Sequence, residues 1–195
     1  MRTYIALIRG LGGDYTFPMK ELVALLEELG FEDVQTYIQS GNAVFRSKRS
    51  DVPALERRIT AAIEERYGFA PRVIILTPKE LAAAVAANPY PEAEAAPTSL
   101  HLTFLAEVPA SPDLDALERL RKPSERFTLK GRVFYLHAPE GVGRSKLFAR
   151  IEKSLGVQGT ARNWRSVRNI LALAEAAEGA GGAPLRGRAT GRRPR

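Results

Sequence analysis

Residues 34–45 read VQTYIQSGNAVF, two segments of strand character joined through Ser40-Gly41, a turn signal of hairpin type. An apolar run at residues 3–8 and a helical pattern after Pro18 precede this hairpin. A second helical pattern at residues 51–67 and a short strand at residues 72–76 follow it. This order predicts one sheet with two helices on one face, which is the ferredoxin-like arrangement.

The same order returns in the second half of the chain. We expect a strand at residues 100–105, a helix at 112–120, a hairpin that turns at Lys130-Gly131 and a helix at 147–155. No closing strand is expected there. In its place we predict a helix with Asn163 as its N-cap and Trp164 on its apolar face. The predicted fold class is therefore α+β, with two ferredoxin-like βαββα(β) units in tandem, a pseudo-duplication, and an extra C-terminal helix.

The predicted domains are residues 1–77 and residues 98–178, the second including the C-terminal helix. Residues 78–97 are interpreted as a linker, with a helix that begins at the capping box of Thr77 and Glu80 and a proline-rich connector after it. Tyr90 in this connector either belongs to a plain link or packs into a cleft between the domains.

Each predicted unit has one sheet face that its own helices do not cover. Such faces bind RNA in some ferredoxin-like modules, and they could also pack on each other. We expect packing, which would bury the strand aromatics that could otherwise stack on bases, namely Tyr4, Tyr37, Phe45 and Tyr135.

Composition narrows the class of protein. The net charge is +7, but residues 179–195 contain five arginines and no acid, so the rest of the chain carries only +2. The tail arginines are Arg186, Arg188, Arg192, Arg193 and Arg195. We expect this tail to be disordered, and it is either a solvated end or a non-specific nucleic-acid contact.

The absence of cysteine excludes disulfides and thiolate catalysis. No apolar run approaches the roughly 20 residues that span a bilayer, and we expect a cytoplasmic location.

The sequence offers few groups for catalysis. His101 and His137 lie in predicted strands, and neither has a second imidazole or a carboxylate at metal-ligand spacing, so we predict no metal site. The hydrolase motifs Gly-x-Ser-x-Gly and His-Glu-x-x-His are missing. No cofactor is indicated.

Three loop clusters carry the remaining signals. Arg9-Gly10-Leu11-Gly12-Gly13 follows the first strand and is either a flexible connection or a loop whose amides contact an anion. Gly143-Arg144-Ser145-Lys146 is expected to open a helix, where cations are unfavourable unless an anion lies nearby, and it lacks the P-loop order. In Thr160-Ala161-Arg162-Asn163-Trp164, a cap and a core anchor explain the last two residues, whereas Arg162 could bind a carboxylate or phosphate.

Taken together, these clusters and the segment Tyr37-Ile38-Gln39-Ser40-Gly41-Asn42 resemble the bacterial family catalogued as domain of unknown function 1697. The resemblance covers residues 1–178 and implies a two-part α+β fold with no established activity. One loop departs from the family pattern. The family has a longer Arg-Gly-Ile-Asn-Val-Gly-Gly loop with a basic stretch after it, whereas this chain has Arg9-Gly10-Leu11-Gly12-Gly13-Asp14-Tyr15.

Three functional hypotheses remain open. The first is a protein, monomeric or homodimeric, that binds a nucleotide, a phosphorylated metabolite or a nucleic-acid backbone in a cleft between the two units. The second is an enzyme that acts on a phosphorylated small molecule, and the third is a homodimeric interaction protein. The predicted binding residues are Arg9, Gly10, Tyr37, Gln39, Asn42, Gly143, Arg144, Ser145, Lys146, Arg162, Asn163 and Trp164.

Overall fold

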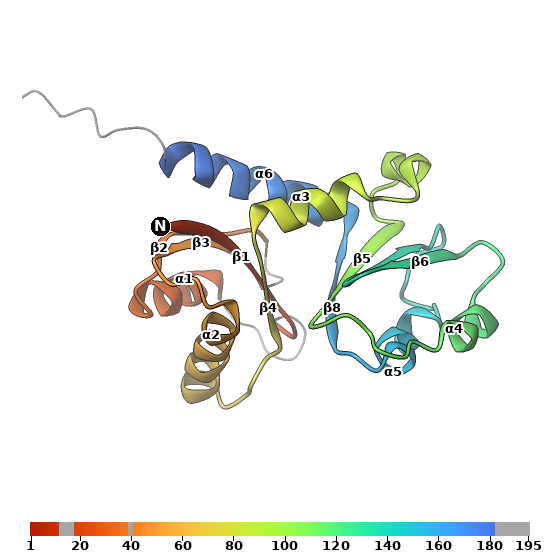
Figure 1. The fold of residues 1–195 in the computed structure, drawn as a ribbon, viewed down its shortest axis with the longest axis horizontal. Coiled ribbons are helices and arrows are strands. Elements are labelled where there is room, and N and C mark those ends of the chain that lie inside the picture. The colour runs from red at the N-terminus through yellow and green to blue at the C-terminus, as the bar shows by residue number, and fades with distance from the viewer. Residues whose placement is uncertain (12–17, 39–40, 182–195) are drawn as a thin grey trace, which may run out of the picture.

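The structure is a computed structural model that describes residues 1–11, 18–38 and 41–181. Its first part is a four-stranded antiparallel sheet of order β2-β3-β1-β4 (Figure 1). Two helices, α1 and α2, cover one face of this sheet, as the sequence predicts. The elements in chain order are β1 (Arg2–Ile8), α1 (Met19–Glu28), β2 (Glu32–Thr36), β3 (Asn42–Ser47), α2 (Val52–Tyr67) and β4 (Val73–Leu76).

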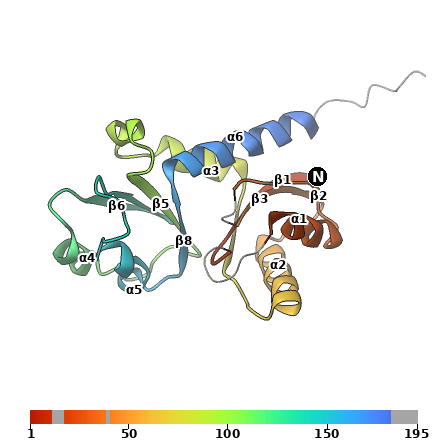
Figure 2. The same cartoon turned by 180° about the vertical axis from the view of Figure 1, so that it is seen from behind.

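The second part is another four-stranded antiparallel sheet, of order β6-β7-β5-β8. The short helices α4 and α5 lie on one face of it (Figure 2). Its elements are β5 (Leu100–Leu105), α4 (Leu114–Leu120), β6 (Arg126–Lys130), β7 (Val133–His137), the 3₁₀ turn η2 (Phe148–Arg150), α5 (Ile151–Leu155) and β8 (Gly159–Asn163).

The strand β8 corrects the expectation that the second half lacks a closing strand. It pairs antiparallel with β5 over the register from His101↔Asn163 to Leu105↔Gly159. The segment GTARN has no apolar run, because β8 is an edge strand and its Thr160 and Arg162 lie at the cavity between the halves of the chain. The expected C-terminal helix is present as α6 (Trp164–Gly181), and Asn163 caps it, since its Oδ1 accepts a hydrogen bond from Ser166 N at 2.9 Å.

The linker helix α3 (Pro78–Ala86) and α6 lie on the faces of the two sheets that α1, α2, α4 and α5 leave open (Figures 1 and 2). The expectation that the two open faces pack directly on each other is therefore wrong. They are joined instead through one hydrophobic core, here called the shared core, to which both sheets and both helices contribute. Its members include Ile5, Val44, Leu102, Tyr135, Leu81 and Val167.

Coverage on both faces explains why residues 4–8 are almost entirely apolar. Along β1, Tyr4 and Ala6 face the core under α1 and α2, whereas Ile5 and Leu7 face the shared core. Tyr4, Phe45 and Tyr135 are all buried, so none of these three aromatics is exposed for stacking on bases.

The connector between the halves is also ordered against the shared core. It contains the 3₁₀ turn η1 (Pro91–Ala95), and the buried Tyr90 shares a hydrogen bond of 2.8 Å with Thr128 Oγ1 on β6. The capping box of α3 forms as predicted, because Thr77 Oγ1 accepts from Glu80 N and the Glu80 carboxylate accepts from Thr77 N. Within the described ranges, no helix is long and apolar enough to cross a membrane.

Candidate functional site

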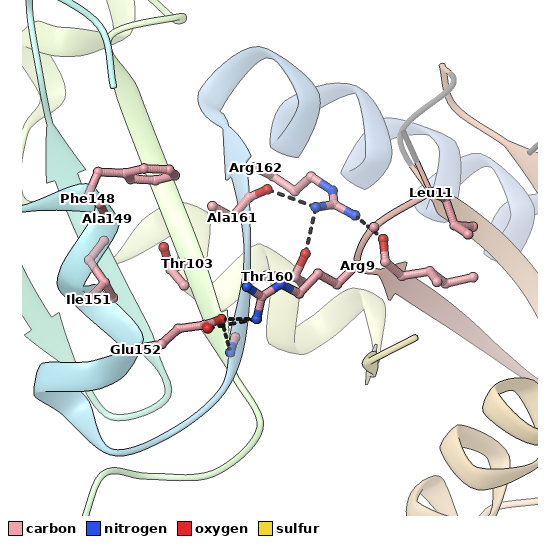
Figure 3. Close-up of a pocket in the computed structure, with 13 residues that line it drawn as sticks. Arg9, Leu11, Thr103, Phe148, Ala149, Ile151, Glu152, Thr160, Ala161 and Arg162 are labelled. Atoms are coloured by element: carbon pink, nitrogen blue, oxygen red, sulfur yellow. Dashed lines mark hydrogen bonds and ion pairs between the residues drawn. The ribbon is translucent and has the colours of Figure 1, made fainter. Parts of the chain in front are cut away.

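The guanidinium of Arg162 connects the two halves of the chain. It extends from β8 toward the end of β1 (Figure 3) and also reaches Asn42 at the start of β3. Nε donates to Asn42 Oδ1 at 2.5 Å, and Nη2 donates to Ile8 O at 3.0 Å and to Gly41 O at 3.4 Å. Nη1 donates to Thr160 Oγ1 at 2.7 Å and to Ala161 O at 2.8 Å. Arg162 therefore binds oxygens of the protein itself, and burial of its guanidinium lowers its pKa to about 10.

The first hairpin is shaped to receive this arginine. Gly41 has a φ of +67°, and Ile8 N donates to Gly41 O at 2.7 Å, which brings the hairpin against the end of β1. Asn42 is fully buried, and its Nδ2 donates to Tyr37 O at 3.1 Å while its Oδ1 receives Arg162. The Tyr37 hydroxyl accepts from Asn169 Nδ2 of α6 at 2.9 Å. The end of β1, the first hairpin and the strand β8 thus meet at one junction.

A second connection lies beside the first. Arg9, directly after β1, donates through Nη1 to both carboxylate oxygens of Glu152 on α5, at 2.5 and 2.7 Å (Figure 3). The side chain of Arg9 is 49% exposed and that of Glu152 is 32% exposed. Glu152 Oε1 also accepts from Gly159 N at 2.9 Å, which holds the carboxylate on the second sheet.

These two arginines border a cavity of about 460 Å³ between the halves of the chain. The hydroxyl-bearing residues Thr103 and Thr160 are buried in its wall, and the ring of Phe148 contributes an aromatic surface. The cavity thus combines cationic, hydroxyl and aromatic groups from β1, β5, β8 and the turn before α5. Its lining residues are Ile8, Arg9, Gly10, Leu11, Thr103, Phe148, Ala149, Ile151, Glu152, Gly159, Thr160, Ala161 and Arg162.

The segment from Gly143 to Lys146 does not border this cavity. The expectation that it opens a helix is wrong, because the first helical turn is η2 at Phe148 and α5 begins only at Ile151. Ser145 is buried and its Oγ accepts from Phe148 N at 3.0 Å, whereas the side chains of Arg144 and Lys146 are exposed. The apolar residues after Lys146 are typical of a helix, but the glycine- and proline-containing turn before them delays its start to Phe148.

Of the other predicted site residues, Trp164 packs in the protein core and Gln39 lies outside the described residues. Trp164 is 3% exposed and packs in the shared core. Gln39 and the five tail arginines are outside the described residues. Among the residues that the structure describes, no three histidine or acidic side chains lie together as metal ligands would.

Three residues of the cavity wall, Thr103, Phe148 and Glu152, were not predicted from the sequence, and Thr160 lies in a predicted segment but was not among the predicted binding residues. Thr103 carried a weak signal, since it is a polar residue between the apolar Leu102 and Phe104 of β5. Glu152 had none, because an acid on a short amphipathic helix is ordinarily a solvated residue.

His101 lies on β5 next to the cavity wall, with its ring 5.9 Å from that of Phe148. Its Nδ1 is buried without a hydrogen-bond partner among the described residues, and burial lowers the pKa of the imidazole. Burial, the largest cause, and the charge of Arg126 likewise lower the pKa of His137. Both histidines are therefore harder to protonate in the native protein than in the unfolded chain.

We expect the free energy of unfolding to fall as the pH is lowered from about 7.5 to about 5.5. In this window the unfolded chain takes up more protons on His101 and His137 than the native chain does, so acid favours unfolding. His101→Gln should flatten this dependence, as measured by urea unfolding at several pH values. His137→Gln is the matched comparison, and an unchanged profile in both variants would contradict the prediction. The lowered pKa values of Glu92 and Glu140 act only at lower pH.

Comparison with known proteins agrees with this architecture. The solved structure of the conserved bacterial protein SP0830 from Streptococcus pneumoniae is similar, with a TM-score of 0.68 and 22% sequence identity. The similarity covers 90% of this chain and 99% of that one, and at this identity it concerns the fold alone. A comparison with curated proteins found no match. The family described as protein of unknown function (DUF1697) matches residues 1–135, and the chain belongs to this family.

Proposed function

We propose that the protein binds a small anionic ligand, a nucleotide or a phosphorylated metabolite, in the cavity beside Arg9. The observation that carries this proposal is the position of Arg9, which projects from the first half of the chain into a cavity walled by the second. The volume of about 460 Å³ falls within the range of small-molecule sites.

The groups in the wall suit such a ligand. Arg9 can donate to two oxygens of a phosphate or carboxylate at once, as its Nη1 does to the two carboxylate oxygens of Glu152. Thr103 and Thr160 supply hydroxyls, and the ring of Phe148 offers a flat apolar surface for a base or another ring. The Glu152 carboxylate occupies the place that the anionic group of a ligand would take, so we infer that the ligand displaces it from Arg9.

The two halves are further inferred to be tandem ferredoxin-like units, residues 1–77 and 98–178, joined by the linker 78–97. The equivalent strand orders β2-β3-β1-β4 and β6-β7-β5-β8 support this inference. Residues 179–195 then form a tail outside both units. In this arrangement the ligand would bridge the units, so that its binding would stabilise their association.

We expect Arg9→Ala and Glu152→Gln to change ligand affinity in opposite directions. Removing the arginine should weaken the binding of adenosine monophosphate about tenfold or more, because a charge-assisted contact is lost. Replacing the glutamate by glutamine removes the competing negative charge while keeping an oxygen for Gly159 N, so affinity should rise severalfold. Isothermal titration calorimetry with adenosine monophosphate, pyrophosphate and uncharged adenosine measures these effects.

Arg144→Ala is the matched control, because Arg144 is an exposed arginine that does not border the cavity. The Arg9–Glu152 pair is half-exposed and worth only about 0–1 kcal/mol, so neither variant should unfold the protein. The proposal is overturned if none of the phosphorylated probes binds, or if Arg144→Ala weakens binding while Arg9→Ala leaves it unchanged.

A further inference from the structure

A second cavity, of about 290 Å³, lies between α3, β5 and the hairpin of β6 and β7. It shares no lining residue with the cavity beside Arg9. The adjacent β5 residues Thr103 and Phe104 border one cavity each, which places the two cavities on opposite faces of the second sheet. The two sites are therefore separate.

Most of the wall of this cavity is apolar. One wall is a face of α3 whose residues follow helical spacing, Glu80, Ala83, Ala84 and Ala87. Alanine side chains end at Cβ, so this face leaves a trough that larger side chains would fill. The opposite wall is formed by Leu76, Phe104, Leu105, Val133 and the ring of Tyr135.

Two cations stand at the edge of the trough, on either side of the Gly131 turn. Lys130 Nζ donates to Ala87 O at 2.7 Å, and Arg132 Nε donates to Leu105 O at 3.1 Å. These bonds hold both side chains over the cavity and leave further N–H groups on each. Within the described part of the chain, neither residue forms an ion pair.

Glu80 is the one acidic residue in the wall. Its Oε2 accepts from both Thr77 N and Thr77 Oγ1, at 2.7 and 2.8 Å, which holds the carboxylate at the start of α3. The lining therefore carries one excess positive charge, at the end of the trough that Lys130 and Arg132 flank.

We propose that this trough binds an amphipathic monoanion, a short aliphatic chain with one carboxylate. The aliphatic chain leaves water as it covers the solvent-accessible apolar part of the trough at Ala83, Ala87 and Val133, and the carboxylate accepts the remaining N–H groups of Lys130 and Arg132. The volume of about 290 Å³ lies at the lower limit of small-molecule sites, which favours a short chain over a long one. Residues 179–195 carry five arginines and no acid, so their charge does not complement this positive edge.

The test is calorimetric titration of the full chain with octanoate, and with octanol and octylamine as neutral and cationic probes of the same chain length. Octanoate should bind more tightly than either. The double variant Lys130→Gln, Arg132→Gln should weaken octanoate about tenfold, toward the affinity of octanol, because the charge-assisted contacts are lost.

A filling variant tests the trough itself. Ala83 is exposed and lies in the cavity wall, so Ala83→Leu should abolish octanoate binding without burying a strained side chain. Ala86→Leu makes the same change at an exposed position of α3 outside the wall and should bind as the unmodified protein does. Equal binding of octanoate and octanol, equal loss in both leucine variants, or no binding at all would each overturn the proposal. None of these results depends on the cavity beside Arg9.

Discussion

Replacement of Arg162 by alanine is expected to lower the free energy of unfolding by about 3–5 kcal/mol. The substitution removes the five hydrogen bonds that Arg162 donates to described residues and leaves buried acceptors, among them Asn42 Oδ1 and Thr160 Oγ1, without this donor. A buried acceptor that loses its donor costs about 1–3 kcal/mol, and the missing side chain also leaves a cavity. Urea denaturation followed by the fluorescence of Trp164 would measure the change.

Two other variants separate the geometry of the guanidinium from its charge. Arg162→Lys keeps a positive charge but has a single nitrogen, so it cannot reach acceptors on β1, β3 and β8 together, and we expect an intermediate loss. Arg165→Ala removes an exposed arginine at the start of α6 and should change stability by about 0.5 kcal/mol at most. A loss below about 1 kcal/mol for Arg162→Ala would contradict the structural role assigned to this residue.

The second large effect is expected for Gly41→Ala. A Cβ at this position would lie 2.4 Å from Ile8 O and 3.2 Å from Ile8 Cβ, and the φ of +67° disfavours any side chain. The hairpin would have to move away from β1, which would break the bond from Ile8 N to Gly41 O and displace Asn42 from Arg162. We expect a loss of about 3 kcal/mol or more in the free energy of unfolding.

Gly131→Ala is the matched control, since Gly131 also has a positive φ, +55°, but no atom within 4 Å of the added Cβ. It should cost only about 1 kcal/mol, the conformational penalty alone. Similar losses for Gly41→Ala and Gly131→Ala, measured by urea denaturation, would show that contact with Ile8 does not matter.

The elements that were predicted correctly have local signals. The hairpin of residues 34–45 has its turn glycine, and the capping box at Thr77 identifies the start of α3. The strand β8 was missed because GTARN is short and polar, and its pairing with β5 depends on residues more than fifty positions away. Local periodicity carries no information about such partners.

In the candidate site, too, residues with a local sequence signal could be predicted, and contacts between distant positions could not. Arg9, Asn42 and Arg162 were among the predicted binding residues, and the structure brings these three close together, whereas Arg144, Ser145 and Lys146 do not border the cavity. The sequence could not indicate that Arg162 binds Ile8 O, because that contact joins positions 154 residues apart. Nor could it identify Glu152 as the partner of Arg9, since the pairing depends on how the second sheet is placed against the first.

The shared core has a consequence for synthesis on the ribosome. The first sheet is complete once residue 76 has been made, but α6, which covers its open face, begins only at Trp164, roughly ninety residues later. At ordinary translation speeds this is a delay of about 4–18 seconds. Throughout that interval the nascent chain lacks the helix that completes the cover over Ile5, Val44 and Ile74, so chaperone engagement should be greatest before α6 emerges.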